Sequence, residues 1–421
     1  MNFIKISSVS VCALIFMALF VPTTYLQIKI PFLLVAILST SALGLENNRL
    51  WDKTTIYACS VLAIFGFLNS VHGQFNDAPG AVRVLSVMFA WPLLYGFLSI
   101  FANQPEAILS LSKLFLATLF FIIVYSFLYI GHESGIVPDL LYFELDQGQI
   151  IGFYEGFYEY NLYSISSLLF LVPFAFHRAL NLYYKSEISI KTVSLLIATI
   201  LLVVLTGRRA VQLVLMMTPI FIITSHIILD IKLNKSNQKK PIKVFYKIIL
   251  LIFGGLAIIY FLTKMTIDMD VLWSIFIDGF DFVEGESSFA RTAQFDSLMQ
   301  AWLNGNILFG AGNGAAVDVV RSDEFSWAYE LTYIYLLFST GIVGVIFYFG
   351  WFGWGLLRVR NGLQNTPTIA PYVAPMITGV FGLAIGAATN PYFGKFDYLW
   401  IIMLPHLIAG GLKYQQVNRF K

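Results

Sequence analysis

The sequence predicts an all-α fold: a polytopic transmembrane helix bundle of about twelve spans, forming a single integral membrane domain over residues 1–421. The chain is 58% hydrophobic and only 12% charged, and its mean hydropathy is +0.76. A soluble domain has about a quarter charged residues and cannot hide this much apolar surface in one core. Basic residues also gather in alternate loops, which is typical of multi-pass membrane proteins.

Apolar stretches of about 17–25 residues are long enough to cross a bilayer as helices. Those in this chain are 6–26, 29–45, 54–72, 79–102, 107–131, 161–178, 190–206, 210–229, 248–264, 331–357, 371–389 and 397–413. No small-residue cleavage site follows the first stretch, so we expect a retained helix rather than a signal peptide. Two outer loops, 132–160 and 265–330, are too long to be plain connectors, and we expect the second to be partly helical.

The orientation follows from the positions of lysine and arginine, which are enriched in cytoplasmic loops. The outer loop 132–160 contains neither residue. With a cytoplasmic N-terminus, the basic groups that fall inside are Arg49 and Lys53; Arg178, Lys185 and Lys191; residues 232–247; Arg358 and Arg360; and Lys413, Arg419 and Lys421. Both termini are therefore predicted to be cytoplasmic.

Several chemistries are excluded by composition and motif. The net charge of +2 suggests no nucleic-acid partner. The five histidines fall on different faces of the membrane and show no HExxH motif and no i, i+4 pairing, so we expect no metal site. The chain has no GxSxG motif, and no DxD-like pair marks a nucleotide-sugar site on the cytoplasmic side. Cys12 and Cys59 both fall in apolar runs and read as small core residues.

Arg208 and Arg209 interrupt the apolar run LLVVLTGRRAVQLVLMM, residues 201–217. Each guanidinium would cost at least a few kcal/mol at the bilayer centre, so we place the pair in a tight outer turn between the seventh and eighth spans. One interpretation is that they bind phosphate or another anion, because arginine offers a bidentate fork to phosphate oxygens. The alternative is that they are interfacial anchors whose side chains snorkel.

A helix is predicted in outer loop 265–330, in the stretch SSFARTAQFDSLMQAWLNG, residues 287–305. Apolar residues recur there with the spacing of one helical face. Arg291 falls in the first turn, where the positive end of the helix dipole disfavours a cation. Either an anion rests at this helix start, or Arg291 pairs with Glu284 or Glu286.

A glycine-rich stretch, LFGAGNGAA, follows this helix at residues 308–316. Gly310, Gly312 and Asn313 in this stretch either let the backbone approach a ligand or make a tight turn. The spacing is not GxGxxG and no strand precedes it, which excludes a dinucleotide-binding motif.

Two more places offer groups suited to carbohydrate chemistry. Glu330 and Tyr333 fall at the outer mouth of the tenth span. A carboxylate there is either a desolvated acid or base, or a charge that suits the start of a helix. The segment FYEGFYEY, residues 153–160, offers aromatic faces and acidic acceptors for sugars, or forms part of an aromatic belt at the membrane interface.

The outer arginine pair, the Arg-led amphipathic helix, the GAGNG stretch and the sequence ELTYIYLLFSTGIVG entering a span together resemble the O-antigen polymerase and ligase superfamily of bacterial envelope glycan assembly. The resemblance covers roughly residues 190–350, a polymerase/ligase-like core that includes outer loop 265–330. It implies a metal-independent membrane glycosyltransferase, without a cofactor, in the bacterial cytoplasmic (inner) membrane.

The donor implied by the resemblance is an oligosaccharide linked to undecaprenyl diphosphate. Membrane lipid, a flippase and chain-length regulator proteins are the other partners implied. Ligases of the superfamily carry a histidine in the long outer loop, and residues 265–330 contain none. The chain therefore resembles a polymerase, which joins repeat units into O-antigen or capsule. A ligase, and a flippase or other transporter of lipid-linked oligosaccharide, are the alternatives.

The candidate site combines residues from the elements above. The guanidiniums would stabilise the leaving diphosphate, and a carboxylate would take the proton from the incoming sugar hydroxyl. For this to work, the arginine turn and the start of the predicted helix must meet at the outer leaflet. The catalytic candidates are Arg208, Arg209, Arg291 and Glu330. The substrate-binding candidates are Tyr154, Glu155, Tyr158, Gln294, Gly310, Gly312, Asn313 and Tyr333.

Overall fold

The computed structural model describes residues 3–133, 135–145, 150–154, 157–185, 189–206, 208–231, 286–320 and 325–419. The predicted ninth span, 248–264, and the part of the outer loop before residue 286 lie outside the described residues. In chain order the α-helices are α1 (Phe3–Phe20), α2 (Leu26–Glu46), α3 (Lys53–Phe75), α4 (Ala81–Leu85), α5 (Trp91–Leu94), α6 (Gly96–Ala102), α7 (Ala107–Glu133), α8 (Leu168–Lys185), α9 (Ile190–Leu205), α10 (Arg209–Ile228), α13 (Glu286–Asn304), α14 (Thr332–Asn365), α15 (Ala370–Ala387) and α16 (Phe396–Arg419).

Short helical turns and one hairpin complete the described fold. The short turns are η1 (Asn48–Leu50), η2 (Ser86–Ala90), η3 (Asp139–Leu141), η4 (Tyr163–Ser167), η6 (Pro367–Ile369) and η7 (Tyr392–Gly394). Strands β1 (Ile150–Tyr154) and β2 (Phe157–Asn161) pair antiparallel. The hairpin was not predicted, and it is the one departure from an all-α chain within the described residues.

Among the described residues, nine segments are long and apolar enough to cross a membrane. This confirms a polytopic membrane helix bundle. The nine are α1, α2, α3, the run from α4 to α6, α7, η4 with α8, α10, α14, and η6 with α15. Helix α9 is apolar but has only 16 residues. Helix α16 has 24 residues and lies outside these nine.

The predicted spans 79–102 and 6–26 differ from the helices observed for reasons visible in the backbone. The span 79–102 was expected to be one helix, but a π-helical turn at η2 interrupts it just before Pro92. Proline has no backbone N–H to donate, and a π turn is a common local adjustment of the helix. The first span ends at Phe20 instead of residue 26, because the chain turns through left-handed backbone at Thr23 and Tyr25, with φ of 64° and 55°.

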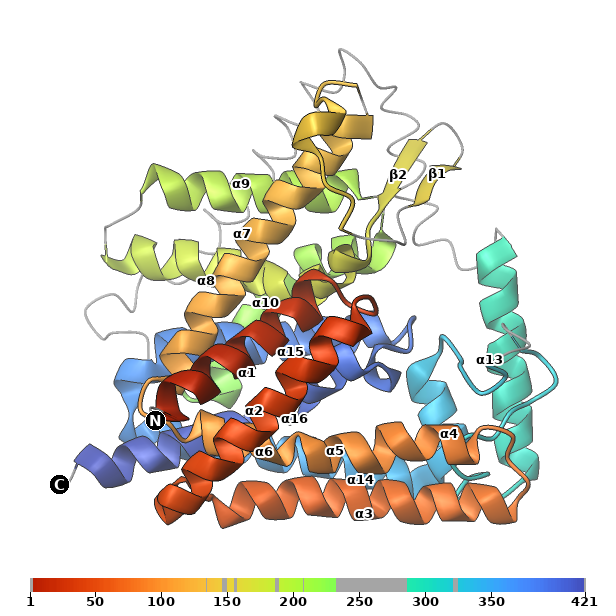
Figure 1. The fold of residues 1–421 in the computed structure, drawn as a ribbon. Coiled ribbons are helices and arrows are strands. Elements are labelled where there is room, and N and C mark those ends of the chain that lie inside the picture. Colours follow the sequence, from red (N-terminus) through yellow and green to blue (C-terminus); the bar gives the residue numbers. More distant parts are fainter. Residues whose placement is uncertain are drawn as a thin grey trace.

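The centre of the bundle is α8, which packs against α7, α10 and α15. Every residue from Leu168 to Phe176 is buried, Pro173 included. A helix that is apolar on all sides is stable only inside a larger structure. Figure 1 shows α7 crossing α8 and α9, while α3 and the run from α4 to α6 lie side by side at one edge of the molecule.

The glycine-rich loop is inserted into a break in α14. At Gly341 the backbone has φ of 63° and leaves the helical conformation. On the N-terminal side of the break, the carbonyls of Phe338 and Ser339 accept hydrogen bonds from loop N–H groups, at 2.9 and 2.8 Å. On the C-terminal side, the N–H groups of Ile342 and Val343 donate to loop carbonyls, both at 3.1 Å. The loop therefore satisfies both helix ends, as a membrane environment requires.

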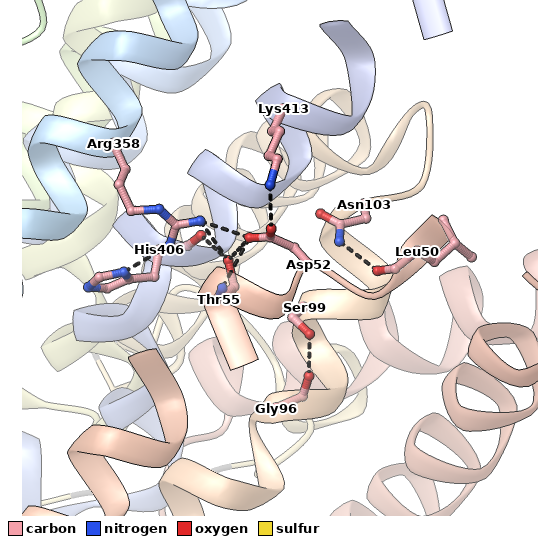
Figure 2. Close-up of polar contacts among 9 residues, drawn as sticks. All are labelled: Leu50, Asp52, Thr55, Gly96, Ser99, Asn103, Arg358, His406 and Lys413. Carbon is pink, nitrogen blue, oxygen red and sulfur yellow. Dashed lines mark hydrogen bonds and ion pairs between the residues drawn. The ribbon is translucent and has the colours of Figure 1, made fainter. Parts of the chain in front are cut away.

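A buried ionic cluster joins α3, α14 and α16 at one end of the bundle (Figure 2). Asp52 caps α3 and accepts hydrogen bonds from the N–H and hydroxyl of Thr55, at 3.1 and 2.6 Å. Nη2 of Arg358 lies 2.8 Å from one Asp52 oxygen, and Nζ of Lys413 lies 3.3 Å from the other. Nδ1 of His406 lies 3.1 Å from Nη1 of Arg358. Arg358 and Lys413, predicted only as markers of topology, thus share one buried carboxylate.

Candidate functional site

Arg291 and Glu330, singled out separately in the sequence, are paired in the structure. Nε of Arg291 donates to Oε2 of Glu330 at 3.1 Å. Their side chains are 32% and 10% exposed, so the carboxylate is the more buried partner. Helix α13 begins at Glu286, which places Arg291 in its second turn rather than its first. The described partner is therefore a carboxylate 39 residues further along the chain. Glu284 and the side chain of Glu286, the partners predicted from the sequence, lie outside the described part of the structure.

The Arg291 guanidinium is partly shielded from water, and this burial lowers its pKa. The contact with Glu330 uses the Nε donor, whereas a guanidinium has five N–H donors in all. In the described part of the chain, no other ion pair involves Arg291. Its terminal nitrogens are thus suited to a second, anionic partner.

Gln294 lies three residues after Arg291 on the same helix and is 2% exposed. Residues three apart on a helix share a face. Its side-chain oxygen Oε1 is buried and has no hydrogen-bond donor among the described residues. Buried polar atoms are nearly always paired with protein, water or ligand. This oxygen is therefore a buried acceptor without a donor in the described structure, three residues from Arg291 on α13, and a ligand hydroxyl or a water would satisfy it.

The two adjacent arginines have different environments. Arg208 occupies the N-cap position of α10, and its Nη1 donates to Oγ of Ser166 at 2.7 Å. The hydroxyl of Tyr392 donates to the same Ser166 oxygen at 3.4 Å. Arg209, the first residue of α10, is exposed. The structure thus separates the predicted pair, with Arg208 held against the protein and Arg209 facing outward.

Lys395 joins this region and was not singled out in the sequence. It precedes α16, and its Nζ lies 5.8 Å from the ring centroid of Tyr392. Burial lowers the pKa of Lys395, the positive charge of Arg208 lowers it further, and Asp397 raises it. The signal in the sequence was a lysine between two spans on the predicted outer side, against the pattern of the other outer loops.

A chain of contacts connects the two arginine regions through the turn between α15 and α16. The hydroxyl of Thr332, two residues after Glu330, donates to the carbonyl of Asn390 at 3.2 Å. Two residues later, Tyr392 contacts Ser166, which binds Arg208. All these groups therefore lie on one side of the bundle. Whether Arg208 and Arg291 hold a single ligand stays a prediction.

The glycine-rich loop packs against α3 and α14. A Cβ atom on Gly312, whose φ is +91°, would lie 2.2 Å from the Cα of Gly73. Asn313 is buried, and its Oδ1 accepts a hydrogen bond from Asn69 at 2.8 Å. Gly310, with φ of +70°, packs against the backbone at the α14 break. These contacts favour the tight-turn interpretation, because the polar groups of the loop bond to the protein itself and its glycines lie against the backbone of α3 and α14.

The remaining predicted residues are Tyr333 and those of the hairpin segment. The Tyr333 hydroxyl donates to the carbonyl of Ala384 in α15, at 2.6 Å. Tyr154 pairs in register with Phe157, and Tyr158 with Phe153, across the β1–β2 hairpin. Glu155, in the turn between the strands, lies outside the described residues.

Neither a metal-binding cluster in the described residues nor a known relative identifies the chemistry of the site. Within the described ranges, no group of three or more His, Cys, Asp or Glu side chains is placed to hold a metal ion. No protein-family model matches the chain. A comparison with curated proteins finds no significant match. The chemistry of the site must therefore be argued from its own side chains.

Proposed function

We propose that the protein is a polymerase that joins lipid-diphosphate-linked oligosaccharide repeat units into a surface polysaccharide, O-antigen or capsule. The observation that carries the proposal is the Arg291–Glu330 pair, 3.1 Å apart, with the orphaned oxygen of Gln294 on the next turn of the same helix α13. A guanidinium, a largely buried carboxylate and an unsatisfied acceptor are the groups that a glycosyl transfer without a metal requires.

In the proposed reaction, a hydroxyl of the acceptor sugar attacks the anomeric carbon of the donor. The bond from that carbon to the diphosphate oxygen breaks, and the lipid diphosphate leaves with the electron pair. Glu330 accepts the proton of the attacking hydroxyl. Arg291 holds the carboxylate through Nε and offers its terminal nitrogens to the leaving phosphate, while Gln294 accepts a hydrogen bond from a sugar hydroxyl.

The reaction is proposed to occur at the outer face of a bacterial cytoplasmic membrane, with both termini in the cytoplasm. Glu330 precedes α14, and Arg358 lies in the part of α14 that follows the break at Gly341. The side that carries Arg358 and Lys413 is cytoplasmic by the distribution of basic residues. The Arg291–Glu330 pair and Arg208 then face outward, where lipid-linked repeat units delivered by a flippase would be available.

Deletion of the gene tests the class of function. A polymerase mutant should lose the ladder of long surface glycans while keeping a single repeat unit. Loss of all glycan-capped lipid would indicate a ligase instead. An unchanged surface glycan would contradict both glycosyltransferase assignments and leave a transporter of another substrate.

Two substitutions test the site itself. Glu330→Gln keeps the shape of the side chain but removes the base, and we expect turnover to fall by about 10²–10⁴-fold. Asp296→Asn, an exposed carboxylate on the same helix α13, is the matched control and should keep full polymer output. Near-normal polymer length in Glu330→Gln, at equal protein level, would remove Glu330 from the mechanism.

A further inference from the structure

The loop that follows α13 presents three consecutive large apolar side chains at its tip. Ile307, Leu308 and Phe309 are all exposed, and we call residues 307–309 the apolar tip. Leu303, in the last turn of α13, is exposed as well. Single exposed apolar residues are common on proteins, but a contiguous group marks a surface that contacts a partner, a ligand or lipid.

The backbone of the apolar tip is paired with the protein, although its side chains are not covered. The N–H groups of Phe309 and Gly310 donate to the side-chain oxygen and the carbonyl of Asn306, at 3.0 and 2.7 Å. The carbonyls of Ile307 and Leu308 accept the first two N–H groups after the break in α14, both at 3.1 Å. Paired backbone groups beneath exposed apolar side chains suit contact with hydrocarbon, where water is absent as a hydrogen-bond partner.

The length of α14 after its break places the apolar tip at membrane depth. The helix from Ile342 to Arg358 is about 24 Å long at the α-helical rise per residue. Arg358 belongs to the ionic cluster of Figure 2, which marks one boundary of the hydrocarbon because charges avoid its interior. The hydrocarbon core is about 30 Å thick, and any tilt of the helix shortens the depth that it reaches. Ile342, and the tip bonded to it, therefore lie inside the opposite boundary.

The exposed face of α14 continues directly from the apolar tip. Val343, Ile346 and Phe349 are large, apolar and exposed, and their spacing of three residues places them along one side of the helix. They belong to a segment long and apolar enough to cross a membrane. Because the Val343 N–H donates to the Leu308 carbonyl, the tip adjoins this lipid-facing surface.

We propose that the apolar tip and Leu303 insert into the leaflet opposite the ionic cluster and contact the acyl chains of membrane lipids. In the sequence, this stretch falls inside outer loop 265–330, away from every predicted span. Figure 1 shows α13 running crosswise to α3, which is a membrane-spanning helix. The inserted tip thus anchors the C-terminal end of α13 and holds that helix along the membrane surface.

Anchoring of α13 has a consequence for Arg291. This residue lies about 20 Å from the last residue of α13 at the helical rise. A helix held along the surface keeps Arg291 near the level of the lipid headgroups, where a lipid-linked donor presents its phosphates. That consequence rests on the proposed function, whereas the insertion of the tip does not.

The depth of the tip is measured with single cysteines in the full-length protein lacking Cys12 and Cys59, reconstituted in liposomes of phosphatidylcholine and phosphatidylglycerol. An environment-sensitive fluorophore on Leu308→Cys should be quenched by lipids brominated on their acyl chains. It should be protected from iodide present on both sides of the membrane.

Two matched positions calibrate this measurement. Ile346→Cys, on the lipid-facing side of α14, is the control for hydrocarbon. Asp296→Cys, exposed on α13, is the control for water, because an exposed carboxylate avoids hydrocarbon. Iodide quenching at Leu308→Cys equal to that at Asp296→Cys would overturn the insertion. Protection from both quenchers would mean that protein covers the tip, as in a second copy of this chain, and would overturn it as well.

A second measurement avoids any effect of the fluorophore on the loop. The unlabelled thiol of Leu308→Cys should react with an impermeant maleimide at least about 10-fold more slowly than that of Asp296→Cys, because the reactive thiolate forms only in water. Equal rates would contradict the insertion.

The insertion and the polymerase can fail independently, because the depth measurement needs no turnover. An inserted tip, together with an unchanged surface glycan after gene deletion, would support the insertion and contradict the polymerase. A tip exposed to water, together with a lost glycan ladder after gene deletion, would overturn the insertion and leave the polymerase standing.

Discussion

Replacing Asp52 with asparagine removes one negative charge from the ionic cluster of Figure 2 and changes little else. The side chain of Asp52 is 5% exposed and that of Arg358 is 13% exposed. Breaking a buried pair by removing one partner costs about 3–5 kcal/mol, because the other charge is left uncompensated. Lys413 is 63% exposed and can return to water. We therefore expect Asp52→Asn to lower the free energy of unfolding by about 3 kcal/mol.

The cost should depend on Arg358. Arg358→Met alone leaves Asp52 with Lys413 and Thr55, so we expect a smaller loss of about 1–2 kcal/mol. In the double variant with Asp52→Asn and Arg358→Met, no uncompensated arginine remains. Its loss of unfolding free energy should therefore be about 2 kcal/mol smaller than the sum of the losses of the two single variants. Arg360→Met is the control: its ion pair with Asp230 spans 3.9 Å with side chains 43% and 40% exposed, and should contribute at most about 0.5 kcal/mol.

The assay is equilibrium unfolding in mixed detergent micelles of a protein that lacks Cys12, followed by the reaction of Cys59 with a thiol-reactive fluorophore. Cys59 lies on α3, seven residues after Asp52, and is 2% exposed, so it reacts only when the helix detaches. The reasoning is refuted if the losses of Asp52→Asn and Arg358→Met add to within about 0.5 kcal/mol in the double variant.

Three other predictions follow from positions described above. Arg208→Lys should reduce polymer output more than Arg209→Lys, because only Arg208 is held against the protein; equal effects on glycan ladder length would contradict this. A cysteine at Asn237, a position outside the described residues, should resist an impermeant thiol reagent in intact cells lacking Cys12 and Cys59, and labelling there would reverse the orientation. Gly312→Ala should destabilise the protein by at least about 1 kcal/mol, since a Cβ would collide with α3 in a left-handed backbone; an unchanged unfolding curve would show that the loop can move away.

The spans were predictable because their signal is local. A stretch such as 107–131 is apolar over its whole length, and it forms α7 within a few residues of the expected bounds. The interruption at η2 was less predictable, since Pro92 is compatible with a continuous helix whose freed carbonyl finds another partner. The β1–β2 hairpin was not predicted, because the aromatic and acidic side chains of FYEGFYEY are equally typical of a sugar-binding segment or an aromatic belt at the membrane interface.

The candidate site shows where local reasoning stops. Arg291 was identified from a conflict with its own helix, but its partner lies 39 residues away, a separation that no helical spacing predicts. Lys395 was not predicted because it is a single charge in a short turn, and only tertiary contacts, from Tyr392 to Ser166 and from Ser166 to Arg208, bring it near a second cation. Asn313 was misleading for the opposite reason, since a glycine-rich loop that packs on a helix has the same composition as one that approaches a ligand.

The break in α14 has a mechanical consequence for the outer surface. Four hydrogen bonds connect the loop to the two halves of the helix at Gly341. Any displacement of that loop would leave backbone N–H and carbonyl groups unpaired within the hydrocarbon core of the membrane, which costs several kcal/mol for each group. The loop, the upper part of α14 and the Glu330 that precedes it should therefore move as one rigid piece. Helix α13, which carries Arg291, packs against α14 but takes no part in these four hydrogen bonds.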